Sequence, residues 1–179
     1  MTLSGRCAFT VKPAKRVILL SVLLFQVATL QGQDVPSKDL LDWYRLPDLP
    51  DSIGVGGPCA GISNGALIVA GGAHFRAPFL QGGEKIWTDS IYVLASSFRE
   101  WESGFTLARP MGYAVAAQWG DEVICAGGGN ALEHFVEVIA LRWEGQKISQ
   151  RLLPALPKPR AFASGTVVGD TLYSACQKT

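Results

Sequence analysis

The stretch "ALIVAGGAHF", residues 66–75, decides the fold, because an apolar run stops at two glycines and opens into a polar, aromatic loop. The same pattern returns in "EVICAGGGNA", residues 122–131, and a third apolar run, "DTLYSA", begins at residue 170 without the glycines. A pattern that repeats at a spacing of about 50 residues indicates structural units that stack and share a core.

Each copy is framed by the same signals. A proline-marked turn precedes the apolar run, as in "LPDLP" (46–50), "LARP" (107–110) and "LPKPR" (156–160). After the glycines come a further apolar run and a tryptophan, Trp101 in the first copy and Trp143 in the second. Four short strands in about 50 residues are typical of a β-propeller blade, in particular of the kelch type. We interpret these two tryptophans, with Trp43 and Trp87, as residues that pack between blades.

We therefore predict an all-β fold, a kelch-type β-propeller that is incomplete. One blade is expected at 58–107, a second at 110–153 and the first two strands of a third at 160–175, after a single outer strand at 42–46. This amounts to about two and a half blades of a ring that would need six blades and roughly 300 residues.

The paired glycines predict a structural role. Glycine tolerates positive φ and close backbone approach, which a crowded inner strand needs where it turns into a loop. The alternative, a phosphate-binding turn, requires a helix directly after the glycines, and no capped, helix-period segment follows either pair.

The first residues predict a leader. Lys12, Lys15 and Arg16 precede the mostly apolar run at 17–30, a pattern typical of a secretory signal peptide. We assign residues 1–32 to it, expect the partial propeller at 40–179, and predict a periplasmic or secreted protein. An uncleaved N-terminal anchor is the alternative, and only then is membrane association expected.

Three cysteines follow the leader: Cys59, Cys125 and Cys176. Their odd number, wide spacing and lack of a C-x-x-C motif predict neither a disulfide framework nor a zinc site, so Cys125 is interpreted as a small apolar strand residue. The formal net charge of +1 gives no indication of a nucleic-acid partner.

A resemblance narrows the prediction. The segments "WYRLPDLPD…GGPCAGISNGALIVAGGAHF…GGEKIWTDSIYVL" and "W…LARPMGYAVAAQWGDEVICAGGGN" resemble the N-acetylneuraminate mutarotase (epimerase) family of kelch propellers, in its cyclically permuted branch. The resemblance covers residues 42–175 and implies a six-bladed ring, a sialic acid substrate and no cofactor or metal. Because the chain stops about halfway through such a ring, we expect a truncated member whose open edges favour self-association.

Mutarotation interconverts two anomers through a general acid/base pair, and a carboxylated sugar suits an arginine clamp. The resemblance implies that the loops after Gly-Gly and the proline turns share one face around the central funnel. The catalytic candidates there are Glu133, His134 and His74, and the substrate-binding candidates are Arg76, Arg109, Arg160, Asn130 and Tyr113.

Each candidate has an ordinary alternative. The histidines, and the loop residues Glu84 and Lys85, are also explained as solvated loop residues; Arg109 and Arg160 as partners of loop carbonyls; and Tyr113 as core. The hypotheses for the whole chain are a sialic-acid mutarotase or a fragment of one, a non-catalytic kelch module that binds a glycan or a protein, and an inactive remnant.

Overall fold

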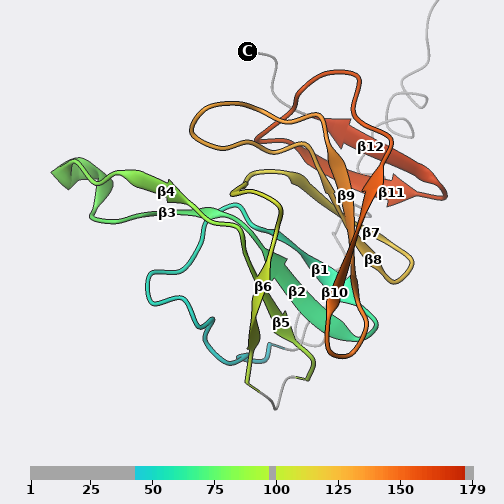
Figure 1. Ribbon diagram of the computed structural model, residues 1–179, viewed down its shortest axis with the longest axis horizontal. Helices are drawn as coiled ribbons and strands as arrows, with labels where there is room; N and C mark the ends of the chain where they lie inside the picture. The colour runs from blue at the N-terminus through green and yellow to red at the C-terminus, as the bar shows by residue number, and fades with distance from the viewer. Residues whose placement is uncertain (1–42, 97–99, 176–179) are drawn as a thin grey trace, which may run out of the picture. The chain divides into compact units, whose positions relative to one another are not determined.

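The computed structural model describes residues 43–96 and 100–175, and the part from Arg45 onward belongs to one compact unit. This unit consists of β-strands, with one short 3₁₀ helix among the described residues (Figure 1). Two antiparallel sheets have four strands each, and in both sheets the strands follow chain order from one edge to the other. The all-β prediction is confirmed.

The strands divide into blades. The first blade comprises β1 (Cys59–Ser63), β2 (Ala66–Ala70), β5 (Ser90–Leu94) and β6 (Glu102–Thr106). The second comprises β7 (Val115–Trp119), β8 (Glu122–Ala126), β9 (Val138–Trp143) and β10 (Ile148–Leu153). A two-stranded sheet follows, β11 (Ser164–Val168) and β12 (Thr171–Ala175). These strands fall within the ranges predicted for two blades and for the first two strands of a third.

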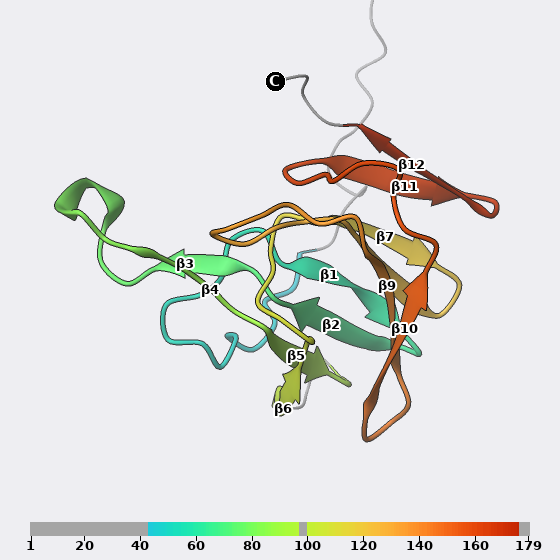
Figure 2. The ribbon, with the colours of Figure 1, turned by 45° about the horizontal axis from the view of Figure 1, so that its top comes forward.

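A hairpin arm lies between β2 and β5. It comprises β3 (Ala73–Phe75), the 3₁₀ helix η2 (Phe79–Gln81) and β4 (Lys85–Trp87). The arm extends away from the blades, as Figures 1 and 2 both show. It fills the long loop that the sequence places after the first Gly-Gly pair.

Local sequence explains the strands. In β2 the buried residues Ala66, Ile68 and Ala70 alternate with less buried ones, the period of a strand. Asn64 and Gly65 have φ of 48° and 79°, the left-handed conformation of a type I′ turn, which suits the right-handed twist of the paired strands β1 and β2.

The paired glycines join one blade to the next. Gly71 and Gly127 have φ of 65° and 69°. The amide of Gly72 donates to Met111 O at 2.7 Å, and the amide of Gly128 donates to Arg160 O at 2.6 Å. A Cβ on Gly71 or Gly127 would collide with the same two carbonyl oxygens. The predicted structural role of these glycines is confirmed.

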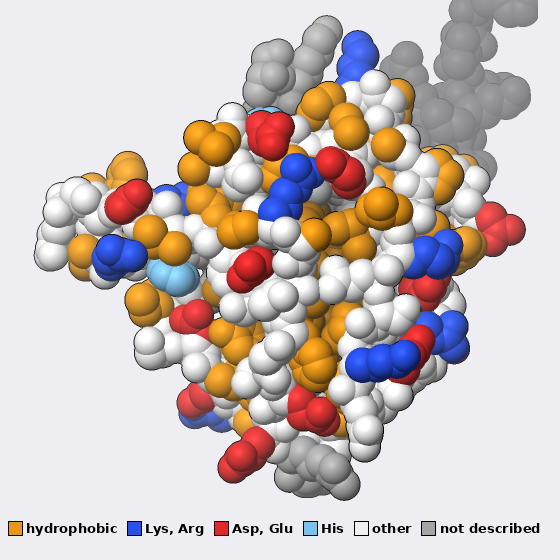
Figure 3. All heavy atoms as spheres, in the orientation of Figure 1, with side chains coloured by type: hydrophobic (Ala, Val, Ile, Leu, Met, Phe, Trp, Pro, Cys, Tyr) orange, Lys and Arg blue, Asp and Glu red, His pale blue; other side chains and the backbone are white. Residues whose placement is uncertain are grey.

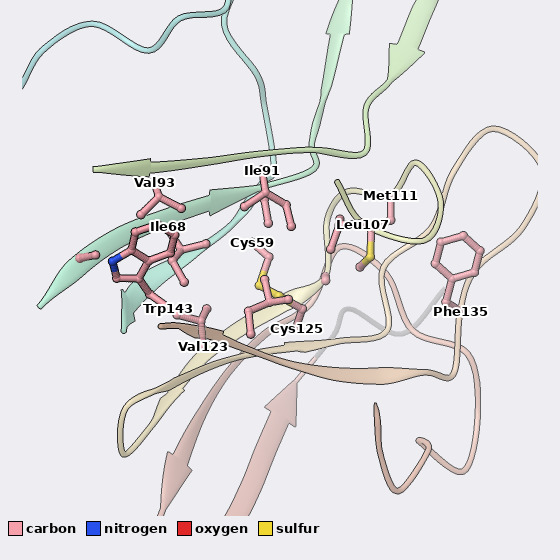
Figure 4. Packing of buried hydrophobic residues seen from close by; sticks show 14 residues of the cluster. Cys59, Ile68, Ile91, Val93, Leu107, Met111, Val123, Cys125, Phe135 and Trp143 are labelled. Carbon is pink, nitrogen blue, oxygen red and sulfur yellow. A yellow bond between two sulfur atoms is a disulfide. The ribbon is translucent and has the colours of Figure 1, made fainter. Parts of the chain in front are cut away.

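The core lies between the blades. Strand β1 contacts β7 and β8, and β7 contacts β11, so the first strands of consecutive blades lie side by side. Ile68 and Ile91 of the first blade pack against Val123 and Trp143 of the second (Figure 4). Burying each such side chain contributes about 1.5–3 kcal/mol.

A disulfide crosses the same core. Cys59 at the start of β1 is bonded to Cys125 in β8, with a Cα–Cα distance of 5.8 Å (Figure 4). The interpretation of Cys125 as an unbonded apolar residue is therefore wrong. Its partner lies 66 residues away, in the neighbouring blade, and only the packing of β1 on β8 brings the two together.

The tryptophans do not share one role. Trp143 is 4% exposed in the inter-blade core, as predicted. Trp43 is 87% exposed and residues 43–46 form no strand, so the predictions of inter-blade packing and of an outer strand there are wrong for these residues. An outer strand needs a sheet edge to pair with, and these residues pair with no described strand.

The predicted leader, residues 1–32, lies outside the described residues, as does Cys176. Within residues 43–96 and 100–175, no helix is long and apolar enough to cross a membrane. The leader and its anchor alternative stay predictions.

Candidate functional site

The loops that follow Gly-Gly and the turns that precede the next blade lie at one end of the blades. The hydrogen bonds from Gly72 to Met111 and from Gly128 to Arg160 join them directly. On the face shown in Figure 3, hydrophobic side chains lie exposed among acidic and basic ones, including on the hairpin arm. The candidate site is built at this end.

Three residues hold corresponding positions just before the inner strands. Gly57, Tyr113 and Phe162 have φ of 63°, 57° and 55°, all left-handed. The amide of Tyr113 donates to Gly57 O at 2.7 Å, and the amide of Phe162 donates to Tyr113 O at 2.9 Å. This backbone course, rare for aromatic residues, sets the Tyr113 and Phe162 rings side by side.

The rings of Trp87, Tyr113 and Phe162 form an aromatic cluster. Tyr113 stacks on Phe162 with ring centroids 4.4 Å apart, and Trp87 meets Tyr113 edge-on at 5.5 Å. Phe162 is 59% exposed. Tyr113, predicted to bind substrate, thus joins residues from the hairpin arm and from the turn before β11.

Lys85 completes this cluster. Its Nζ lies 4.2 Å from the Tyr113 ring centroid, 4.7 Å from Trp87 and 5.8 Å from Phe162. Aromatic faces attract a cation through their quadrupole, but they do not neutralise its charge. Among the described residues, Lys85 has neither an ion pair nor a side-chain hydrogen bond.

Arg109 forms a second cluster, in which two carboxylates neutralise its positive charge. Its guanidinium lies 2.6 Å from a Glu137 oxygen and 3.6 Å from a Glu133 oxygen, and it covers the Phe135 ring at 3.6 Å. The structure therefore brings two predicted site residues, Arg109 and Glu133, into one ion-pair group.

Glu137 is the anchor of that group. A hydrogen bond from its own backbone amide, the charge of Arg109 and the Val136 amide lower the pKa of the Glu137 carboxyl, against a smaller opposing effect of burial. The carboxylate is therefore ionised at neutral pH and holds Arg109 in place, which makes it a poor proton donor for catalysis.

His74 and Arg76 lie on the hairpin arm, beside an open cleft of about 770 Å³ that Tyr113 and Phe79 also line. The Nδ1 atom of His74 is buried, and no described residue hydrogen-bonds to it. A buried polar atom without a partner is uncommon, but burial leaves this nitrogen no exposed surface on which a ligand could bind.

The second-blade loop carries the remaining candidates. His134 meets the Phe162 ring edge-on at 6.1 Å and is exposed, beside Glu133. Asn130 Oδ1 accepts hydrogen bonds from the amides of Leu132 and Glu133, so this side chain shapes the loop. Arg160 contributes its carbonyl to the inter-blade hydrogen bond. No ligand contact tests these assignments, and all eight candidates stay predictions.

No protein-family model matches the chain. The N-acetylneuraminate epimerase of Yersinia pestis (strain Pestoides F) is 32% identical over 136 residues, which cover 65% of this chain and 33% of that protein. The N-acetylneuraminate epimerase of Salmonella enteritidis PT4 is 34% identical over 110 residues, 52% of this chain and 28% of that one.

Over these stretches the chain is similar to proteins named N-acetylneuraminate epimerase. It spans about a third of the length of the curated relatives it matches. A solved structure titled "Structure of YjhT" superposes with a TM-score of 0.57 at 24% identity, over 64% of this chain and 36% of that one. This likeness shows the fold, and the resemblance read from the sequence is confirmed.

The sequence did not show that Lys85, Trp87 and Phe162 surround Tyr113. Lys85 was one of the loop candidates, with a solvated residue as its alternative; Trp87 was interpreted as packing between blades, and Phe162 was not singled out. Comparing "MGYA" at 111–114 with "RAFA" at 160–163 would have shown that Tyr113 and Phe162 hold corresponding positions. Within the described residues, no group of His, Cys, Asp and Glu is arranged to hold a metal ion.

Proposed function

We propose that this chain is part of a sialic-acid mutarotase, which interconverts the α and β anomers of N-acetylneuraminate. The observation that carries the proposal is the similarity to proteins named N-acetylneuraminate epimerase over 136 residues of the chain. The reaction needs a base that takes the anomeric hydroxyl proton and an acid that protonates the ring oxygen; ring closure on the other face reverses both transfers.

The described residues supply parts for this chemistry at one end of the blades. His134 is the candidate for proton transfer, because its exposed imidazole lies beside the Phe162 ring, where a sugar ring would rest. Glu133, the next residue, is the candidate partner, and Arg109 holds its carboxylate at 3.6 Å. Glu137 fixes Arg109 from the other side.

The test is proton NMR of freshly dissolved α-N-acetylneuraminate with the full chain, after circular dichroism has shown a folded β protein. We expect anomer exchange faster than in buffer alone. His134→Gln and Glu133→Gln would each lower the enzymatic rate about a hundredfold, in the range typical for a general acid or base. Lys147→Met, in the turn at the opposite end of the second blade, is the control that leaves the rate unchanged.

Exchange at the buffer rate from a folded sample would contradict the enzymatic proposal. It would favour the alternative, a kelch module that binds a glycan without turnover, for which the exposed Phe162 ring already provides a surface. Self-association through open sheet edges stays a prediction, which light scattering of the same sample tests.

We also propose a periplasmic or secreted location. The Cys59–Cys125 disulfide supports it, because such bonds persist in oxidising compartments and are rare in the bacterial cytosol. Expression of the full chain in a bacterium, followed by fractionation and thiol labelling, is the test. We expect the protein in the periplasm with both cysteines protected from the label; a cytoplasmic protein with both thiols labelled would overturn the proposal.

A further inference from the structure

We propose that Lys85, held over the aromatic cluster, is the binding residue for the carboxylate of an acidic sugar. The apolar face of the sugar ring rests on the exposed part of Phe162. This inference deepens the proposed function and rests on it for the identity of the sugar. It assigns a specific binding role to a loop lysine that the sequence leaves open between a loop candidate at the funnel and a solvated residue.

The fold fixes the position of Lys85. Pairing of β3 with β4 sets Lys85 opposite Phe75 and Trp87 opposite Ala73, so Lys85 and Trp87 lie on the same face of the hairpin arm. The Nζ atom then reaches Tyr113 at the start of the second blade and Phe162 before β11. Segments separated by more than seventy residues in the sequence meet at this ammonium group.

The charge balance favours Lys85 over Arg109 as the partner of an incoming carboxylate. Arg109, at the same end of the blades, already lies against the carboxylates of Glu133 and Glu137. Lys85 is half-buried, and its neighbours are ring faces that stabilise a cation without neutralising it. An incoming carboxylate would find a positive charge in a poorly hydrated setting, where attraction is stronger than in bulk water.

The exposed Phe162 ring beside Lys85 indicates which class of ligand this surface would bind. Exposed aromatic rings beside a cation suit a molecule with an anionic group attached to a compact ring that has an apolar face. Phe162 is 59% exposed and stands 5.8 Å from Nζ, a separation that one sugar acid spans. A neutral sugar would use the rings alone, and a simple anion would use the ammonium alone.

The experiment compares two ligands and five forms of the full chain. Dissociation constants for N-acetylneuraminate and for its uncharged methyl ester are measured by NMR titration of wild type, Lys85→Met, Lys85→Arg, Phe162→Ala and Lys147→Met. Lys147→Met removes the same charge from a residue that pairs with Glu144 at the far end of the blade. Circular dichroism confirms that each variant is folded.

We expect Lys85→Met to weaken binding of the acid by about tenfold to a hundredfold, the effect of losing one charge-assisted hydrogen bond. Binding of the ester would change little. Lys85→Arg would retain most of the preference for the acid, and Lys147→Met would match wild type. Phe162→Ala would weaken both ligands to a similar extent, since it removes the ring and leaves the ammonium.

Unchanged binding of the acid by folded Lys85→Met overturns the inference, whatever the wild-type exchange rate. Anomer exchange by wild type that Lys85→Met retains at the same KM also overturns it, while the proposed function stands. Lys85-dependent binding without exchange supports the inference and sinks the enzymatic proposal. Wild type that neither binds the acid nor exchanges its anomers overturns both.

Discussion

The junction between the first two blades and the junction between the second blade and the β11–β12 hairpin share one backbone plan. In the first, Gly72 N donates to Met111 O; in the second, Gly128 N donates to Arg160 O. At both junctions a leucine methyl group, from Leu107 or Leu156, packs beside the first glycine. The hydrogen-bonded frame is thus repeated residue for residue.

The side chains at the two junctions differ. The first buries the Cys59–Cys125 disulfide and the hydroxyl of Ser63. Strand register places Val115 and Trp119 at the positions of Cys59 and Ser63 in the second junction. Backbone geometry is therefore copied between blades, while each junction has its own side-chain contacts.

The largest expected effect comes from the disulfide, which only the first junction has. Replacing both cysteines, Cys59→Ala with Cys125→Ala, should lower the free energy of unfolding by about 4 kcal/mol, the chain-entropy estimate for closing a loop of this length. Urea unfolding followed by tryptophan fluorescence measures it. Reductant should destabilise wild type and leave the variant unchanged; equal midpoints for the two proteins would contradict the prediction.

The glycines test the shared frame. Gly71→Ala and Gly127→Ala each place a Cβ against a carbonyl oxygen of the next blade and should each cost about 3 kcal/mol. Gly65→Ala and Gly120→Ala are matched controls, because their φ is also positive but nothing lies within 4 Å of the added Cβ. They should cost about 1 kcal/mol.

The same urea titrations compare all four glycine variants. Similar losses for Gly71→Ala and Gly127→Ala would establish that both junctions form in solution. A loss for Gly127→Ala no larger than that for Gly120→Ala would show that the second junction is open.

Ser63 and Trp119 hold corresponding positions in the two junctions but make contacts of different strength. Ser63 Oγ donates to Asp121 O at 2.5 Å and accepts from Trp143 N at 2.9 Å, fully buried. Ser63→Ala leaves both groups unpaired and should cost about 2 kcal/mol. Trp119 Nε1 contacts Asp170 at 3.4 Å on the surface, so Asp170→Ala should cost about 0.5 kcal/mol or less. Thermal unfolding gives both values, and a larger loss for Asp170→Ala would reverse the ranking.

The smallest effect concerns pH. The folded-state pKa of Glu137 lies below its ordinary value of 4.5, so its stabilisation is present above that value and is lost as the pH falls through the folded pKa. Because the Arg109–Glu137 pair is partly exposed, about 0.5 kcal/mol is expected. The stability difference between wild type and Glu137→Gln, measured from pH 7 to pH 3, should shrink toward acid; a constant difference would contradict this assignment.

The blades were predictable because their signals are local. Gly-Gly after an apolar run, and proline before the next, report positive φ and a turn within a few residues. The placement of both loop sets at one end of the blades was implied by the family resemblance, and the hydrogen bonds between them confirm it. These features need no knowledge of which side chains meet.

The contacts between blades were not predictable in this way. Arg109 and Arg160 look alike beside their prolines, yet the hydrogen bonds show that Arg160 corresponds to Met111, whose side chain is buried. Trp101 precedes a fourth strand, whereas Trp143 ends a third strand. How the strands of one blade align with those of the next decides which of these side chains are buried, and the sequence of a single strand does not encode that alignment.

The left-handed positions before the inner strands, Gly57, Tyr113 and Phe162, have an evolutionary consequence. The same backbone conformation holds glycine, tyrosine or phenylalanine, so duplication of a blade supplies equivalent positions at which later substitutions can occur independently. These positions are coupled, because a Cβ at Gly57 would meet the ring of Tyr113 in the next blade. Substitutions at equivalent positions of adjacent blades should therefore show epistasis: an aromatic residue in one blade limits which residue the preceding blade can accept.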